Sequence, residues 1–356
     1  MRVGLVGAGV ISHNHLPHLL RLGAEVRVYS EAGAPELVAA HGGAVAVSLD
    51  ELLDWAQVID LASPTHTHYA LARQALSAGR DVICEKPLAR TDEQADELVE
   101  LARQTGRHLY PSHVVRYFPA YARLRGAVRD GLLGDLAVLR FYRSGGFPVR
   151  SAWFADRDLS GGVVLDMMIH DLDIARWLAG EVTQVSATWT RAGDAGQPAD
   201  TGQPADTGQP VDTGQPVDTG QAHDTGQPAE ASHVLLTHES GAITQVSGVW
   251  GAAHLRFTTG YFVAGTGGTL EYDRAADRGF VPDLARGPAR GEAVPETDPA
   301  EDPYYLVLAD FLGAIRDGTP TRVTAADGAA AVRIANAALR SARTGQPVTL
   351  VAGAAS

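Results

Sequence analysis

The sequence predicts an α/β protein of two domains, a doubly wound parallel sheet followed by a mostly antiparallel sheet with its own helices. Six strand-like segments alternate with helix-like segments over residues 1–117, and a glycine-rich turn follows the first strand. Short strands separated by glycine turns dominate the part after residue 118 and indicate an antiparallel sheet. A chain of 356 residues also exceeds one ordinary hydrophobic core, which supports two domains.

Composition and charge disfavour several classes of protein. The single cysteine excludes an internal disulfide framework and suits a reducing compartment. The N-terminus MRVGLVGAGV lacks the apolar run of a signal peptide and no segment is apolar over the width of a bilayer, so we expect a cytoplasmic protein without membrane contact. The formal charge is −13, but residues 193–230 carry seven acidic and no basic side chains. The rest is only mildly acidic, which disfavours nucleic acid as a partner.

The glycine-rich turn GAGVIS has the surroundings of a dinucleotide-binding fingerprint. Gly7 permits the tight turn, Gly9 lets a pyrophosphate approach the backbone, and the helix N-terminus at Val10 and Ile11 faces the phosphates. Ser12 replaces the third glycine and is small enough for close packing of helix on strand. The element order is the required one: strand Arg2–Val6, turn Gly7–Ser12, helix to about Leu22, strand Glu25–Tyr29.

The end of the second strand should distinguish NAD from NADP. An acidic residue there hydrogen-bonds the ribose 2′-hydroxyl, whereas an arginine accepts a 2′-phosphate. The chain has Ser30, which tolerates a phosphate, followed by Glu31, which repels one if it points inward. The sequence therefore predicts NAD or NADP without distinguishing them, with Ser30 as a cofactor contact.

The remaining elements of the first domain alternate as a doubly wound sheet requires. Ser48 is expected to cap a helix, with Glu51 completing a capping box, and Thr91 is expected to cap another. The other predicted elements are a helix at 35–41, strands at 44–47 and 58–62, a helix at 69–79, and strands at 81–84 and 108–112.

The strand at 58–62 ends in further candidate cofactor contacts. Ser63 and Thr65 lie at its carboxyl end and can line the nicotinamide side of a cleft. His66 and His68 are two residues apart, without cysteine or carboxylate partners nearby. We therefore expect no metal site there, and we assign His68 to capping, packing or cofactor contact.

Lys86 is the only lysine in the chain, against 28 arginines. It follows the strand 81–84 and Glu85 and precedes Pro87, so it lies beyond the carboxyl end of a strand, where open α/β sheets bind ligands. Lysine is a compact donor whose pKa falls on burial, whereas arginine stays charged, so the two are not interchangeable in proton chemistry. We interpret Lys86 as a candidate catalytic residue; the alternative is a surface lysine.

A second candidate site lies on a helix predicted over residues 163–178. Asp166 and His170 are four residues apart and share one face, with Asp173 one turn further along the same stripe. A carboxylate one turn before a histidine can orient the imidazole and support its protonated form, which suits a general base. The alternative is a salt-bridged helix with a packed histidine.

Residues 193–231 form a low-complexity insert between two strand-like segments, 182–190 and 232–237, which we expect to pair. The insert contains GQPADT twice, GQPVDT twice, GQAHDT once and a partial sixth copy. Its largest apolar side chain is valine, so it cannot bury enough surface to offset its ordering entropy. We interpret it as a solvated or disordered loop.

The last part of the chain is predicted as further sheet and two closing helices. Their alanine-rich faces suit packing against the sheet, and a segment at 274–301 rich in Pro, Gly and Arg is expected to be mobile. The predicted strands are 243–250, 255–259, 261–264 and 269–272, and the helices are 302–317 and 325–344.

Four motifs together resemble the glucose-fructose oxidoreductase, inositol dehydrogenase and rhizopine catabolism (Gfo/Idh/MocA) family. They are GAGVIS, SPTHTHYALARQALSAGRDVICEKPLART, GGVVLDMMIHDLDIARWL and the C-terminal ADFLGAIRDGTPTRVTAADGAAAVRIANAALRSARTGQPVTL. The combination of EKP with D-x-x-x-H-D is specific, and the match covers nearly the whole chain except the insert. The resemblance implies a Rossmann domain at 1–117 and an α+β domain at 118–356, whose large, mostly antiparallel sheet is often used to form dimers or tetramers.

The resemblance also implies NAD(P)-dependent oxidation or reduction at a hydroxyl carbon of a sugar, cyclitol or related polyol. Carried over by position, the catalytic residues are Lys86, Asp166 and His170, and Glu85 and Lys86 also contact the cofactor. His170 would exchange the hydroxyl proton, Lys86 would polarise or relay through the same oxygen, and Asp166 would orient the pair.

Two rival functions share this fold. A glycoside hydrolase with bound NAD would release an aglycone without net NADH. A non-catalytic NAD(P)-binding regulator would not need Lys86 and His170 together. Arg116 and Tyr117, at the predicted domain junction, are weaker candidates for cleft contacts, and a structural hinge is equally compatible with their position.

Overall fold

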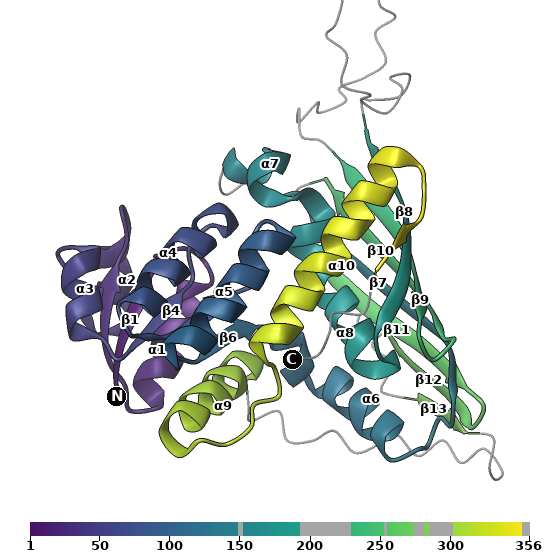
Figure 1. Cartoon of the computed structure of the whole chain (residues 1–356), viewed down its shortest axis with the longest axis horizontal. Helices are drawn as coiled ribbons and strands as arrows, with labels where there is room; N and C mark the ends of the chain where they lie inside the picture. The colour runs from purple at the N-terminus through teal and green to yellow at the C-terminus, as the bar shows by residue number, and fades with distance from the viewer. Residues whose placement is uncertain (149–151, 193–228, 253–254, 274–280, 285–301, 351–356) are drawn as a thin grey trace, which may run out of the picture.

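Six parallel strands form the first sheet of the computed structural model, in the order β3-β2-β1-β4-β5-β6. Figure 1 shows this sheet and its helices on one side of the molecule and the second sheet on the other. The structure describes residues 1–148, 152–192, 229–252, 255–273, 281–284 (backbone only) and 302–350. The strands are β1 (Arg2–Val6), β2 (Glu25–Tyr29), β3 (Ala44–Val45), β4 (Val58–Leu61), β5 (Asp81–Glu85) and β6 (Leu109–Ser112). The strand order reverses between β1 and β4, as in a Rossmann sheet, so the predicted class of the first domain is confirmed.

Helices alternate with these strands and bury them. Every residue of β4 and β5 is buried, and both strands are apolar apart from Asp60, Asp81 and Glu85. The helices are α1 (Ser12–Arg21), α2 (Ala34–His41), α3 (Leu49–Trp55), α4 (Thr65–Ser77) and α5 (Asp92–Thr105). Helix α4 thus begins four residues before the predicted start, directly after the strand end.

The predicted caps are present, but one capping box is not. The Ser48 hydroxyl accepts from the Glu51 amide at 3.1 Å, and Thr91 accepts from the Gln94 amide at 3.3 Å. The Glu51 carboxylate accepts instead from the Val47 amide at 2.7 Å and pairs with Arg27 at 2.8 Å. The Glu51 carboxylate therefore bonds the amide one residue before Ser48 and an arginine of β2, and the predicted capping box does not form.

Eight strands form the second sheet, in the order β13-β12-β11-β7-β10-β9-β8-β14. Neighbours pair antiparallel except β7 with β10, so the prediction of a mostly antiparallel sheet is confirmed, as is the pairing of β8 with β9. The strands are β7 (Leu136–Gly146), β8 (Val182–Arg191), β9 (Glu230–His238), β10 (Ile243–Gly251), β11 (Thr258–Gly265), β12 (Gly268–Asp273), β13 (Val281–Leu284) and β14 (Val348–Thr349).

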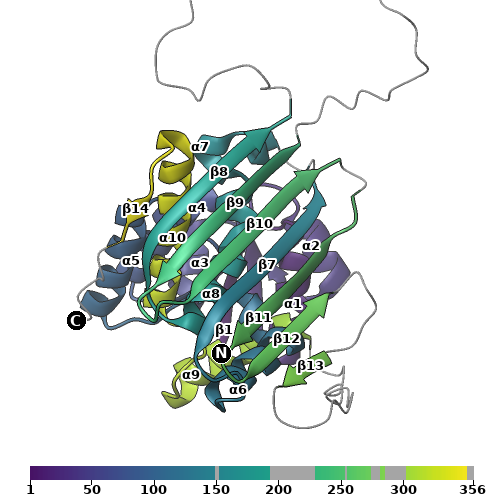
Figure 2. The ribbon, with the colours of Figure 1, turned by 90° about the vertical axis from the view of Figure 1, so that its right-hand side faces the viewer.

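The two faces of this sheet have different surroundings. Leu139 and Phe141 of β7 are buried on the inner face, against which α8 (Ile169–Ala179) packs, whereas Arg140 between them is exposed on the outer face. Figure 2 shows the described helices behind the sheet and the outer face open toward the viewer. The alternation of inward apolar and outward polar residues is the ordinary pattern of a sheet covered on one side.

Three strand predictions need correction. The segments 255–259 and 261–264 are one strand, β11, because Leu255 lies in a turn whose amide donates to the Ala252 carbonyl at 2.8 Å. Strand β13 pairs with β12 inside the segment 274–301 that was expected to be mobile; the rest of that segment lies outside the described residues. The predicted insert 193–231 extends too far at its C-terminal end, because Glu230 and Ala231 belong to β9. Residues 193–228 lie outside the described residues.

The two closing helices do not both pack on the second sheet. Helix α10 (Ala325–Thr344) packs against β8 and also against α5, where Arg340 pairs with Asp92 at 3.0 Å. Helix α9 (Pro303–Asp317) packs against α1 of the first domain, with the rings of Tyr305 and His18 edge to face. The prediction that α9 covers the sheet is wrong, and α10 is the closing helix that joins the two sheets. Among the described residues, no helix combines the length and apolar character needed to cross a bilayer.

A buried ion-pair network lies at the junction. Arg116, in a 3₁₀ turn after β6, is 1 % exposed; its Nη2 donates to Asp173 of α8 at 2.6 Å, and its Nη1 to Asp327 of α10 at 3.2 Å. This geometry supports the hinge interpretation of Arg116. It also corrects the prediction that Asp173 extends the stripe of Asp166 and His170, because Asp173 faces Arg116 instead.

Replacing Arg116 by methionine should lower the free energy of unfolding by about 3–5 kcal/mol, because Asp173 would stay buried without its counter-charge. Arg103→Met is the control, since Arg103 pairs with Glu100 on the exposed surface of α5 and should change stability little. Urea denaturation followed by circular dichroism measures both. Equal, small changes in the two variants would contradict the structural role of Arg116.

Candidate active site

A cleft of about 440 Å³ is lined by residues of both sheets and contains the single lysine. The first sheet contributes Ile11, Glu85 and Lys86, and α8 with the turn before it contributes Asp166 and His170. The structure therefore brings together the three predicted catalytic residues. They lie at the carboxyl end of β5, the edge where α/β sheets bind ligands.

The Lys86 ammonium is fixed in the wall of this cleft. Its Nζ donates to the backbone carbonyl of Asp166 at 2.7 Å and to Asp166 Oδ1 at 3.2 Å. Only 16 % of the Lys86 side chain is exposed. The alternative of a surface lysine is therefore wrong.

A π-helical turn, Val164–Met168, precedes α8, where a regular helix was predicted. The wider turn means that residues four apart are no longer stacked on one face. Asp166 faces Lys86, and among the described residues no hydrogen bond joins its carboxylate to His170. The prediction that Asp166 orients His170 needs correction, because the partner that Asp166 holds is Lys86.

His170 is a neutral imidazole in this site. Burial, and then the positive charges of Lys86 and Arg143 and the neighbouring His113, hold its pKa well below the ordinary value of 6.5. The expectation that a carboxylate supports its protonated form is therefore wrong. Its Nδ1 is buried without a hydrogen-bond partner among the described residues. A neutral imidazole beside an ammonium can accept a proton from a bound hydroxyl.

The glycine-rich turn fits a dinucleotide pyrophosphate. Gly7 has φ +111°, and a Cβ there would lie 2.5 Å from the Ala62 carbonyl oxygen, so only glycine fits. At Gly9 nothing lies within 4 Å of the Cβ position, which leaves the backbone open to approach. Helix α1 has no side-chain cap and no acidic residue in its first turn, so no side chain of that turn competes with an anion at its N-terminus. Val10 is exposed and Ile11 lines the cleft.

The other predicted cofactor contacts lie at the carboxyl ends of β2 and β4 and at the start of α4. Ser30 and Ser63 are half-buried at the carboxyl ends of β2 and β4, and Thr65 is buried at the start of α4. Both ring nitrogens of His68 lie 2.8 Å from backbone carbonyl oxygens, those of Pro87 and Ser63. His68 is 1 % exposed and is not among the residues that line this cleft, so its contact with the cofactor stays a prediction.

Glu85 lines the cleft, although it is only 5 % exposed. Its Oε2 accepts from the Lys86 amide at 3.1 Å, and its Oε1 lies 3.3 Å from His15 Nε2. Burial alone would raise the pKa of Glu85, but the hydrogen bond and charge of His15 lower it below its ordinary value. Glu85 is therefore ionised, and His15 is a neighbour that the sequence reasoning did not identify.

Sequence reasoning also missed a buried charge and several aromatic side chains in the cleft. Arg143 of β7 donates to Asp171 through Nε at 3.0 Å and Nη2 at 2.8 Å, with both side chains buried. An arginine at an inward position of an alternating strand was a usable signal. The aromatic side chains of the cleft gave no signal in the sequence, because they come from distant segments. They are Phe118, Tyr121, Phe154, Trp250, Phe257 and Tyr304.

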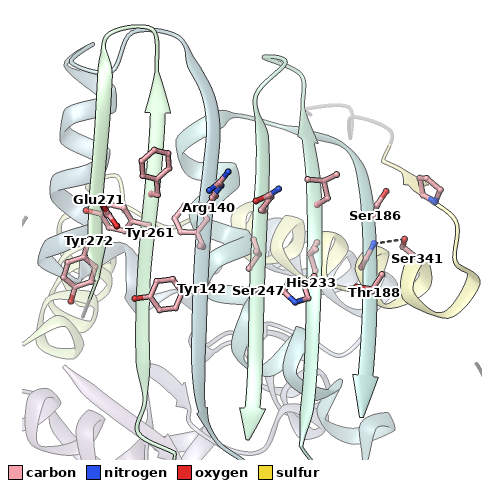
Figure 3. Close-up of a pocket in the computed structure, with 18 of the residues that line it drawn as sticks. Arg140, Tyr142, Ser186, Thr188, His233, Ser247, Tyr261, Glu271, Tyr272 and Ser341 are labelled. Carbon is pink, nitrogen blue, oxygen red and sulfur yellow. Dashed lines mark hydrogen bonds between the residues drawn. The ribbon is translucent and has the colours of Figure 1, made fainter. Parts of the chain in front are cut away.

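A larger hollow of about 840 Å³ lies away from this cleft, over the second sheet. Figure 3 shows its labelled side chains, among them Arg140, Tyr142, His233 and Ser247, standing on neighbouring strands, with Ser341 of α10 bonded to the backbone of β8 at one edge. It contains none of the predicted catalytic or cofactor residues. The candidate active site is therefore the smaller cleft.

Two family models match the chain. The model described as "Oxidoreductase family, NAD-binding Rossmann fold" matches residues 1–113, and the GFO/IDH/MocA C-terminal domain matches residues 121–271. The 1,5-anhydro-D-fructose reductase of Ensifer adhaerens is 27 % identical over 99 % of both chains. Inositol 2-dehydrogenase 1 of Saccharopolyspora erythraea is 32 % identical over 54 % of this chain and 58 % of that protein, so this match spans about half of each chain.

Solved structures resemble the chain over its whole length. GenD2 from gentamicin A biosynthesis, solved in complex with NAD, is 25 % identical with a TM-score of 0.76, covering 99 % of this chain and 97 % of that one. Levoglucosan dehydrogenase, solved with NADH and levoglucosan, has the same TM-score at 21 % identity and covers 99 % of both chains. The second likeness concerns the fold alone.

Replacing Lys86 by methionine should raise the pKa of His170, because it removes a positive charge that disfavours the imidazolium. In the wild type the imidazole should titrate well below pH 6.5, and in Lys86→Met it should titrate at a higher pH. Arg140→Met, on the outer face of the sheet, is the control and should leave the titration unchanged. NMR of ¹⁵N-labelled histidine measures the pKa of His170. An unchanged His170 titration in Lys86→Met would refute this electrostatic account.

Proposed function

The chain belongs to the GFO/IDH/MocA family of NAD-binding oxidoreductases, and we propose that it transfers a hydride between NAD and a secondary alcohol, or the matching ketone, of a sugar, cyclitol or related polyol. The observation that carries the proposal is the pairing of an anchored ammonium, Lys86, with a neutral imidazole, His170, in one cleft beside the glycine-rich turn. These are the two groups that removal of a hydroxyl proton requires.

Oxidising a secondary alcohol removes a proton from oxygen and a hydride from carbon. The bound nicotinamide would supply the hydride acceptor. His170 takes the hydroxyl proton, because its low pKa leaves the imidazole free to accept. Lys86 donates a hydrogen bond to the same oxygen and stabilises the negative charge that develops there, while Asp166 holds Nζ in position. In reduction the same groups return the proton to oxygen.

The lining of the cleft supports a sugar or cyclitol as substrate. Aromatic side chains such as Phe118, Phe154 and Trp250 offer flat apolar surfaces to the carbon face of a ring. Polar groups, Tyr121 and Thr259, offer hydroxyl contacts in the same cleft. The names of the relatives, an anhydrofructose reductase and an inositol dehydrogenase, agree with this class.

The end of β2 favours NAD over NADP. Residues 29–36 include Glu31 and Glu36 and no basic side chain, so a 2′-phosphate would meet negative charge without a counter-charge from this segment. The 2′-hydroxyl of NAD has no such conflict. We therefore assign NAD as the cofactor.

The outer face of the second sheet supports a homodimer or a homotetramer. Leu235 and Ile243, on the neighbouring strands β9 and β10, are 41 % and 42 % exposed there, and no described helix covers them (Figure 2). Exposed apolar side chains on an open sheet mark an interaction surface. A second copy of the chain is the partner that we propose for this face.

Titration with NADH and NADPH, followed by a panel of sugars, cyclitols and polyols monitored at the nicotinamide absorbance, tests the proposed reaction. NADH should bind more tightly than NADPH, and at least one panel member should be turned over. Lys86→Met and His170→Ala should each lose about 10²–10⁴ in kcat while still binding NADH. His233→Ala, on the outer face of the sheet, should keep the wild-type rate.

Other outcomes identify the rivals. A variant at Lys86 or His170 that keeps the wild-type rate would remove that residue from the mechanism. Release of an aglycone without net NADH would identify a glycoside hydrolase. NADH binding without turnover of any panel member would favour a regulator, and no binding of either cofactor would contradict the assignment of the glycine-rich turn.

The sheet-face contact is tested by light scattering after size exclusion. The wild type should have the mass of a dimer or tetramer, and Leu235→Glu with Ile243→Glu should reduce it. Leu132→Glu is the control, because Leu132 is 50 % exposed outside this face. A monomeric wild type, or a double variant with unchanged mass, would contradict an oligomer built on this face.

A further inference from the structure

A buried histidine lies between two carboxylates directly behind Lys86. His15 of α1 is fully buried, with Nδ1 2.8 Å from Asp60 Oδ2 and Nε2 3.3 Å from Glu85 Oε1. Asp60 is also fully buried, in the middle of β4, and Glu85 ends β5. The proton and hydride transfers described above use neither His15 nor Asp60.

The charge balance requires His15 to be an imidazolium. Among the described residues, His15 is the only cationic group within ion-pair distance of Asp60 or Glu85. Leaving a buried carboxylate without a counter-charge is costly. Burial lowers the pKa of His15, but the charges and hydrogen bonds of Asp60 and Glu85 outweigh it and raise that pKa to about 10.

The three residues join the segments that form the cofactor side of the cleft. His15 lies on the helix that follows the glycine-rich turn, Asp60 precedes the strand end at Ser63, and Glu85 directly precedes Lys86. The Glu85 carboxylate has one oxygen near His15 and the other on the Lys86 amide at 3.1 Å. Glu85 is therefore the link between the imidazolium and the backbone of the catalytic lysine.

We propose that His15 is a positioning residue: its imidazolium holds the Glu85 carboxylate, and through it the backbone of Lys86, in register with the glycine-rich turn that binds the cofactor. This inference rests on the proposed function, because it assigns Lys86 to catalysis. Without the imidazolium, the ionised Glu85 would lose its counter-charge beside the Lys86 ammonium. The ammonium would then be drawn away from Asp166, its partner in the cleft wall.

Asp60 has a different part in the cluster. It accepts from Nδ1 and so fixes the ring orientation, but among the described residues no hydrogen bond or ion pair joins it directly to Glu85 or Lys86. In Asp60→Asn the imidazole keeps a carboxylate partner, Glu85, and the link to Lys86 survives. A simple core ion pair of His15 and Asp60 would instead make the two substitutions equivalent.

The experiment compares His15→Asn with Asp60→Asn and with His238→Asn. His238 is a matched control, a histidine 2 % exposed and bonded to Gly180 and Thr244 in the second domain. With NAD and substrate saturating, and rates taken per NADH-binding site, His15→Asn should lose about 10²-fold in kcat, the effect of misplacing a catalytic group by about 1 Å. Asp60→Asn should lose far less, and His238→Asn should keep its kcat.

A second readout does not depend on turnover. Because Lys86 is the only lysine, the rate of its acylation, followed by peptide mass spectrometry, reports the exposure and reactivity of this one side chain. The rate should rise in His15→Asn and stay near the wild-type value in Asp60→Asn and His238→Asn. If His15 affected stability alone, all three variants would have lower melting temperatures, but the rate of Lys86 acylation would not rise selectively in His15→Asn.

If His15→Asn does not fold, the Glu85→Gln background replaces it, since His15→Asn with Glu85→Gln removes one charge of each sign. In that background the His15 substitution should have no further effect on kcat, because Glu85 carries its influence. Folded His15→Asn with unchanged kcat and unchanged Lys86 acylation, or a full His15 effect in the Glu85→Gln background, would overturn the proposal. Wild-type protein without turnover would refute the proposed function, while the acylation pattern would still decide the role of His15.

Discussion

The contact between Lys86 and Asp166 is the interaction on which the site depends. It joins the carboxyl end of β5 in the first sheet to the turn before α8, which packs on the second sheet. Helix α10 holds the two sheets in this relation, because it is bonded to α5 and to β8. A cleft with one wall from each sheet can therefore keep an ammonium and an imidazole at a fixed spacing.

The charges around the cleft are arranged in pairs. Glu85, Asp166 and Asp171 are each held by a different cation, in turn His15, Lys86 and Arg143. Among the described residues no carboxylate is bonded to His170, and two of those cations lower its pKa. The pairing thus satisfies the buried acids and at the same time keeps the general base neutral.

The first sheet was predictable because parallel strands covered on both faces are mostly apolar, and Lys86 was predictable because it is unique in composition. The relation of Asp166 to His170 was not, because the four-residue spacing assumes a regular helix and the chain makes a π-helical turn. The two backbone partners of His68, at Pro87 and Ser63, were not predictable because only the fold brings them together. His15 and Asp60 carried a signal, polar residues in apolar segments, but their partner Glu85 lies on a third element.

The central claim is that His170 is the group that exchanges the substrate proton beside Lys86. Rescue of His170→Ala by added imidazole, measured as NADH formation with the best substrate of the panel, tests this claim most directly. Imidazole should restore turnover in proportion to the concentration of its neutral form, and it should leave Lys86→Met unchanged. Intact NADH binding with no restoration at any imidazole concentration, in a cleft that the alanine leaves open, would contradict the account.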